Sequence, residues 1–157
     1  MLLFRQRATS YVLRRSSDGS EVEVLVFLHI DAPEAGVQVP GGGALPHETV
    51  GQAAIREAFE ETGAAGLALG EVIGNKLMPI QESPVPYQVS TYCWLTTTET
   101  RDSWDHFVNS HDGDHGMRFR CEFRPSTSAG LDWGFDIFLD RAVKRFKTSH
   151  GRVTCAG

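Results

Sequence analysis

Several features that would place the protein in another class are scarce in this sequence. Its 157 residues include three cysteines, an odd number at no metal-ligand spacing, which fits a reduced cytoplasmic compartment. No apolar run approaches the roughly 18–20 residues that cross a bilayer. The apolar stretch at the amino terminus is too short for a signal peptide. We therefore expect a cytoplasmic protein without a membrane partner.

Positive charge is also scarce. Lysine and arginine total 15 against 20 aspartates and glutamates, giving a formal net charge of −5. Without a basic surface, nucleic acid is not expected as a partner. An anionic substrate would have to be attracted by bound cations and local arginines. The sequence has neither internal repeats nor low-complexity segments, so residues 1–157 are expected to form a single domain.

The most informative stretch is residues 42–64, GGALPHETVGQAAIREAFEETGA. Thr49 and Gln52 have the spacing of a capping box at the start of a helix. Gly63 stands where a left-handed residue usually ends one. These two signals predict a helix between Thr49 and Gly63.

Three carboxylates share one face of this predicted helix. Glu57, Glu60 and Glu61 fall at i, i+3 and i+4, where like charges repel by roughly 0.2–0.5 kcal/mol per pair. The helix dipole also disfavours anions in the last turn. One interpretation is a solvated acidic face. The other is a site for a hard divalent cation, which binds carboxylate oxygens.

The wider spacing favours the cation site. The stretch resembles the signature of the Nudix hydrolases at every polar and glycine position. Those positions are Gly42, Glu48, Arg56, Glu57, Glu60, Glu61 and Gly63. Ala58 and Ala64 depart from the signature because the family usually has larger aliphatic residues there. The resemblance implies an α/β fold, the Nudix α/β/α sandwich with a mixed sheet.

The resemblance also implies roles for individual residues. Arg56 would orient the glutamates through charge-assisted hydrogen bonds. Glu48 would lie at the edge of the metal cluster or brace the loop before the helix. The Gly41 carbonyl would be a further metal ligand. The carboxylates implied to hold Mg²⁺ or Mn²⁺ are those of Glu57, Glu60 and Glu61.

The implied activity is metal-dependent hydrolysis of a diphosphate linkage in a nucleoside diphosphate joined to another group. ADP-ribose-like compounds, nucleotide sugars and nucleoside triphosphates all belong to this class. A binding module that senses a nucleotide without turnover is the alternative, and the complete set of Arg56 and three glutamates disfavours it. Pro79 lies fifteen residues beyond Ala64, which is similar to the position of a proline in the ADP-ribose branch of the family. One proline does not identify the branch. The expected partner is a small-molecule substrate, and the sequence is also compatible with a homodimer.

The rest of the chain predicts strands and a closing helix. Side chains alternate between two faces in the predicted strands 88–98 and 117–124, and a helical period marks the end of the chain. The segment 102–116 is long and polar and is expected to be irregular. A tail is expected from Ser149. The predicted strands are 7–15, 22–30, 37–39, 67–76, 88–98 and 117–124, and the helix spans 135–146.

The irregular segment is expected to supply a general base or a further metal ligand. It contains Asp102, Asp105, Asp112 and Asp114, and Asp114 is preferred because Gly113 would let the backbone fold towards a metal. A solvated turn is the alternative. Interleaved histidines, including His106 and His115, lack the spacing of a zinc site.

Further residues are candidates for binding substrate. Arg118 and Arg120 could line a phosphate-binding cleft, although an exposed sheet face also explains them. Tyr87, Trp104 and Trp133 could stack on a base, and each could equally be a partly buried core residue.

Overall fold

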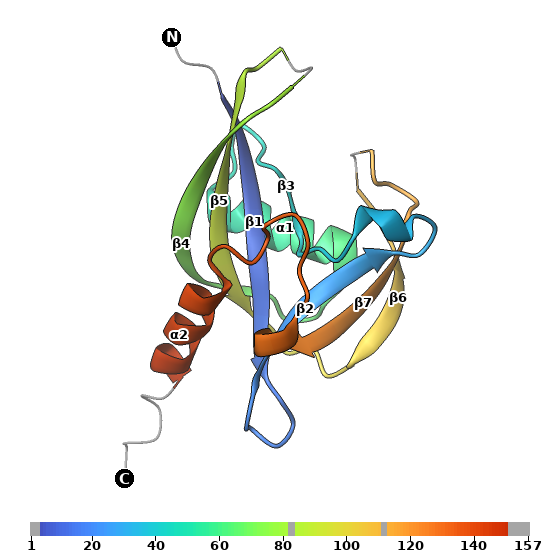
Figure 1. Cartoon of the computed structure of the whole chain (residues 1–157), viewed down its shortest axis with the longest axis vertical. Coiled ribbons are helices and arrows are strands. Elements are labelled where there is room, and N and C mark those ends of the chain that lie inside the picture. The colour runs from blue at the N-terminus through green and yellow to red at the C-terminus, as the bar shows by residue number, and fades with distance from the viewer. Residues whose placement is uncertain (1–3, 82–83, 111–112, 151–157) are drawn as a thin grey trace.

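Seven strands form one mixed sheet in the computed structural model, which describes residues 4–81, 84–110 and 113–150 (Figure 1). The strands are β1 (Phe4–Arg15), β2 (Val22–His29), β3 (Gly41–Gly43), β4 (Ala68–Pro79), β5 (Tyr87–Thr96), β6 (Ser103–Phe107) and β7 (Arg118–Pro125), and the helices are η1 (Pro33–Ala35), α1 (Val50–Thr62), η2 (Ser126–Ser128) and α2 (Leu139–His150). The sheet order is β4-β5-β1-β2-β7-β6, and β3 pairs with β1 off this path. Among the strand pairs of the described residues, only β1–β5 is parallel.

The two long helices cover opposite faces of the sheet (Figure 1). Alternating residues of β1 supply both cores: Ala8 and Val12 pack with α1, and Tyr11 and Leu13 belong to the cluster that includes α2. Strand side chains point alternately to the two faces, so one strand can contribute to both layers. The predicted three-layer sandwich with a mixed sheet is confirmed.

Helix α1 begins and ends as its sequence predicts. The Gln52 amide donates to Thr49 Oγ1 over 3.1 Å, and the Thr49 amide donates to Gln52 Oε1 over 2.9 Å, which completes the capping box. Gly63 ends the helix with a φ of 66°. Ala58 is fully buried, so its small side chain lets the helix lie close to the sheet.

Two predictions about strands are wrong. Residues 103–107 form β6, an edge strand paired with β7, within the segment expected to be irregular. The predicted strand 37–39 is reduced to a single bridge between Phe27 and Gln38. The three consecutive glycines Gly41–Gly43 form β3, because pairing with β1 needs only backbone groups.

The end of the chain also differs from the prediction. Helix α2 begins at Leu139 rather than Phe135, because Phe135 lies in a turn in which its amide donates to the Asp132 carbonyl. Ser149 and His150 belong to the helix, and the rest of the expected tail lies outside the described residues. In the described part of the chain, no helix has the length and apolar character needed to cross a membrane.

Candidate active site

Helix α1 directs two carboxylates inward against strand β3. The side chains of Glu57 and Glu61 are buried, with 3% and 4% of their surface exposed, whereas Glu60 is half-buried. A Cβ atom on Gly42 would lie 2.3 Å from Glu57 Cδ, closer than any real contact. Residue 42 therefore has to be glycine for the Glu57 carboxylate to lie where it does.

Arg56 connects the acidic residues to one another. Its Nε and Nη2 donate to the two carboxylate oxygens of Glu48 over 2.7 and 2.9 Å, which is a bidentate pair. Its Nη1 donates to Glu57 over 2.9 Å and to Glu60 over 3.4 Å. Its Nη2 also donates to the Gly43 carbonyl over 3.1 Å. These contacts place Arg56 among the carboxylates, and the orienting role that the family resemblance implies for it stays a prediction.

Glu48 braces the loop that precedes the helix. Its Oε1 accepts the Leu45 amide over 2.8 Å in addition to the bonds from Arg56. The hydrogen bonds from Arg56 lower the pKa of Glu48, although desolvation acts the other way. The same pairing raises the pKa of Arg56. Glu48 is therefore an ionised anchor for Arg56.

The carboxyl group of Glu61 is buried, and its neighbours shift its pKa in opposite directions. Burial raises its pKa well above the ordinary value, while a 2.8 Å hydrogen bond from the Gly41 amide acts in the opposite direction. The charges of Glu57 and Asp114 raise the pKa further, and Arg7 lowers it. The predicted contribution of Gly41 was its carbonyl; the contact that the structure provides uses its amide.

Among the predicted aspartates that the structure describes, Asp114 is the one whose charge acts on the pKa of Glu61. It is half-buried in the loop between β6 and β7. That loop reaches α1 where the Asn109 amide donates to the Glu60 carbonyl over 3.3 Å. Asp102 and Asp105 form ion pairs with arginines elsewhere, and Asp112 lies outside the described residues.

Arg118 and Arg120 lie apart from this cluster. Their side chains are on the face of β7 opposite the buried Phe119, which packs in the α1 core. Arg118 pairs with Asp31, and Arg120 pairs with Asp105, at exposed positions. Tyr87 is half-buried at the start of β5. Binding of substrate by these three residues stays a prediction.

Two cationic side chains line a cavity beside the acidic residues of α1, and the sequence pattern did not identify them as site residues. Arg7 and Lys76 belong to a cavity of about 300 Å³ on the α2 face of the sheet. Arg7 Nη2 lies 2.9 Å from the position a Cβ would occupy on Gly41. Within residues 4–81, 84–110 and 113–150, neither cation forms an ion pair. Their proximity depends on strand pairing, which no local pattern reveals.

A second recess of about 480 Å³ lies on the outer side of α1 and is lined by Arg56, Glu60 and His106, among others. His106 Nε2 lies 2.9 Å from the Glu60 carbonyl, and His115 Nδ1 accepts the Ser110 amide over 3.3 Å. His106 thus joins strand β6 to α1, and His115 makes a contact within the loop between β6 and β7. Their contacts give no support for a histidine metal site.

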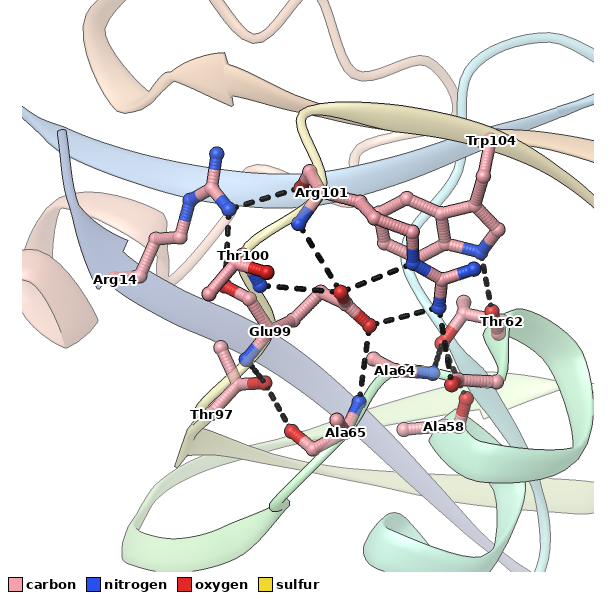
Figure 2. A network of polar contacts seen from close by, with 11 residues as sticks. Arg14, Ala58, Thr62, Ala64, Ala65, Thr97, Glu99, Thr100, Arg101 and Trp104 are labelled. Atoms are coloured by element: carbon pink, nitrogen blue, oxygen red, sulfur yellow. Dashed lines mark hydrogen bonds and ion pairs between the residues drawn. The ribbon is translucent and has the colours of Figure 1, made fainter. Parts of the chain in front are cut away.

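Trp104 belongs to a polar network beyond the end of α1 (Figure 2). Its Nε1 donates to the Thr62 carbonyl over 2.6 Å, and the Arg101 guanidinium lies over its ring. In the same network, Glu99 accepts the Ala65 amide and the Arg101 side chain. These contacts give Trp104 a structural role where β6 meets α1.

The acidic residues of α1 differ in how they fit a divalent metal by arrangement and by chemistry. No group of three or more histidine, cysteine, aspartate or glutamate side chains is arranged to hold a metal in the described residues, and Arg56 occupies oxygens of Glu57 and Glu60. The donor set nevertheless fits a hard cation chemically. It supplies the carboxylates of Glu57, Glu60 and Glu61, two of them on buried residues, and carboxylate oxygens are the ligands that such a cation takes.

Comparison with known proteins agrees with this arrangement. The family model described as NUDIX domain matches residues 4–118. Diphosphoinositol polyphosphate phosphohydrolase 3-beta of Bos taurus is 36% identical over 107 residues, which cover 68% of this chain and 59% of the relative. Diphosphoinositol polyphosphate phosphohydrolase 2 of Mus musculus is 34% identical over 106 residues, which cover 68% and 54%. The chain thus spans less than two thirds of the length of these curated relatives.

Solved structures share the fold at lower identity. A C. elegans Ap4A hydrolase superposes with a TM-score of 0.58 at 20% identity, covering 93% of this chain and 98% of that one. The E. coli dihydroneopterin triphosphate pyrophosphohydrolase gives a TM-score of 0.62 at 16% identity, covering 90% and 98%. With the glycine strand, the acidic helix and the family match in agreement, the chain belongs to the NUDIX domain family.

Proposed function

We propose that this protein hydrolyses a diphosphate linkage in a small phosphorylated molecule and that it needs Mg²⁺ or Mn²⁺ to do so. The observation that carries the proposal is the set of acidic residues held together by Arg56 on α1. Its curated relatives are named phosphohydrolases, which supports the reaction class. The substrate we favour is a nucleoside diphosphate linked to another group.

Different residues of the protein would bind the cation, position the carboxylates and bind the phosphate groups of the substrate. Glu57, Glu60 and Glu61 would hold the cation, which when bound would neutralise charge on the diphosphate and polarise its oxygens. Arg56 would keep the carboxylates in place. Arg7 and Lys76, which line the neighbouring cavity, would bind phosphate groups of the substrate that extend away from α1.

The reaction would exchange one bond for another at phosphorus. A water oxygen would form a bond to one phosphorus as the bond from that phosphorus to the bridging oxygen breaks. The water proton would pass to a carboxylate, and we favour Asp114 because its charge already acts on Glu61 from the facing loop. The leaving phosphate would take up the displaced electron pair.

A screen of purified protein against diphosphate compounds with Mg²⁺ or Mn²⁺ tests the proposal, with released phosphate measured after a coupled phosphatase. Glu57→Gln should lower kcat by about 10²–10³, as expected for one strong electrostatic contributor. Glu71→Gln is the matched control, since Glu71 is a surface carboxylate paired with Arg145 on α2. Full turnover in excess chelator would contradict the proposal. Binding without turnover of any diphosphate would favour the nucleotide-sensing alternative.

A further inference from the structure

Trp133 is an exposed aromatic residue at the edge of the cavity that contains Arg7 and Lys76. Its side chain is 69% exposed, yet its φ of 59° is in the left-handed region. That region is unfavourable for a bulky residue, because its Cβ comes too close to the following carbonyl oxygen. Burial of the indole does not offset this cost because most of its surface stays in solvent. Strain at an exposed aromatic residue beside a cavity suggests a function for the side chain.

Hydrogen bonds fix the orientation of this indole. Trp133 Nε1 donates to the Ala35 carbonyl over 2.7 Å. The neighbouring Asp132 pairs with Val37 in both directions, since the Val37 amide donates to Asp132 Oδ2 over 2.9 Å and the Asp132 amide donates to the Val37 carbonyl over 3.0 Å. The indole is therefore held by its edge, which leaves ring surface for a ligand.

The same turn is anchored to the core. Tyr11 Oη donates to the Phe135 carbonyl over 2.5 Å and accepts the Phe138 amide over 3.2 Å. Tyr11 is fully buried in the cluster that packs against α2. A platform fixed in this way loses little conformational freedom when a ligand binds.

The groups around Trp133 are complementary to a molecule with a planar ring at one end and anions at the other. Lys76 Nζ lies 3.6 Å from the position of a Cβ on Gly134, next to the indole in the chain. Arg7 lies in the same cavity and acts on Glu61. The indole, the ammonium group and the guanidinium group thus line one cavity, and the guanidinium of Arg7 also lies beside Gly41, whose amide donates to Glu61.

We propose that Trp133 determines substrate specificity by stacking on the heteroaromatic base of a nucleotide. The phosphates would run along Lys76 and Arg7 towards Glu57 and Glu61. This inference rests on the proposed function, because it names the substrate class of that same site. Trp104 and Tyr87 are poorer platforms, since Trp104 is half-buried under Arg101 and Tyr87 is half-buried on β5. A base-free polyphosphate would use the two cations but has no heteroaromatic ring to stack on the indole.

A pair of non-cleavable ligands separates base recognition from phosphate recognition. The methylene-bridged analogue of ADP and methylenediphosphonate carry the same P–C–P group with and without a base. Their dissociation constants would be measured by calorimetry with Mg²⁺ for wild type, Trp133→Ala and Trp133→Phe. Phe107→Ala is the control, because Phe107 is an aromatic residue of similar exposure, 66%, on edge strand β6.

Trp133→Ala should weaken the ADP analogue by roughly 5- to 150-fold, the range for loss of one base–aromatic stack. It should leave methylenediphosphonate unchanged, and Trp133→Phe should restore most of the affinity. Equal weakening of both ligands, no weakening of either, or an equal effect of Phe107→Ala would overturn the inference. Circular dichroism would confirm that each variant is folded.

Turnover distinguishes failure of this inference from failure of the proposed function. If wild type hydrolyses nucleotide and base-free diphosphates and Trp133→Ala changes neither KM, the inference fails and the hydrolase proposal stands. If wild type hydrolyses no diphosphate but shows Trp133-dependent binding of the ADP analogue, the hydrolase proposal fails and base recognition stands.

Discussion

Replacing Arg56 by lysine tests whether the guanidinium fork positions the acidic cluster. Arg56 makes five polar contacts with Glu48, Glu57, Glu60 and the Gly43 carbonyl. Lysine keeps the charge but has a single ammonium group, so it cannot reach all of these acceptors from one position. We expect two or three of these charge-assisted hydrogen bonds to be lost, and the ammonium group of lysine to replace only part of them.

The magnitude follows from these contacts. Each hydrogen bond to a charged group contributes about 1.5–3 kcal/mol. Arg56 is only 26% exposed, so solvent screens the loss moderately. A net destabilisation of about 2–4 kcal/mol is expected after partial replacement by the ammonium group. For a chain of this size that lowers Tm by roughly 5–15 °C. Displacing Glu57 by about 1 Å should lower kcat by about 10²-fold.

The assay compares Tm and kcat at saturating substrate and metal. Arg145→Lys is the matched control, because Arg145 makes a bidentate pair with Glu71 over 2.8 Å in both bonds but is 56% exposed. It should change Tm little, because an exposed ion pair contributes little to stability, and it should leave kcat unchanged. If Arg56→Lys raises only KM, Arg56 binds substrate and the positioning argument is wrong.

Three further predictions concern single positions. Gly42→Ala should lower kcat at least tenfold, because the new Cβ would lie 2.3 Å from Glu57 Cδ; a wild-type rate would contradict the steric argument. Asp114→Asn should lower kcat roughly tenfold or more and remove the acidic limb of the pH–rate profile, whereas a wild-type rate would place the base elsewhere. Glu99→Gln should destabilise the fold by about 1–3 kcal/mol at pH 7. The Arg101 side chain lowers the pKa of Glu99 from 4.5 to about 2, so its stabilisation is complete above pH 4.5 and is lost as the pH falls towards 2. Urea denaturation at pH 7 and pH 2.5 would measure this loss, and an equal difference at both values would refute it.

The sequence determined the parts of the site that depend on neighbours along the chain. The Thr49–Gln52 capping box and the left-handed Gly63 are local features, and the structure confirms both. Helical spacing places Glu57 and Glu61 on the same side of α1, which faces β3. The fold class followed from the family signature, because composition and periodicity did not specify how the strands are ordered.

Tertiary structure alone decided what surrounds the acidic helix. Strand β3 consists of three glycines, whose sequence indicates a turn, and it exists because β1 offers backbone partners. Lys76 reaches the cavity of Arg7 through the pairing of β4 with β5 and of β5 with β1. Trp133 belongs to that cavity because Ala35 and Val37 hold its turn from about a hundred residues away. Such contacts depend on pairing between distant segments, and local sequence periodicity contains no information about which segments will pair.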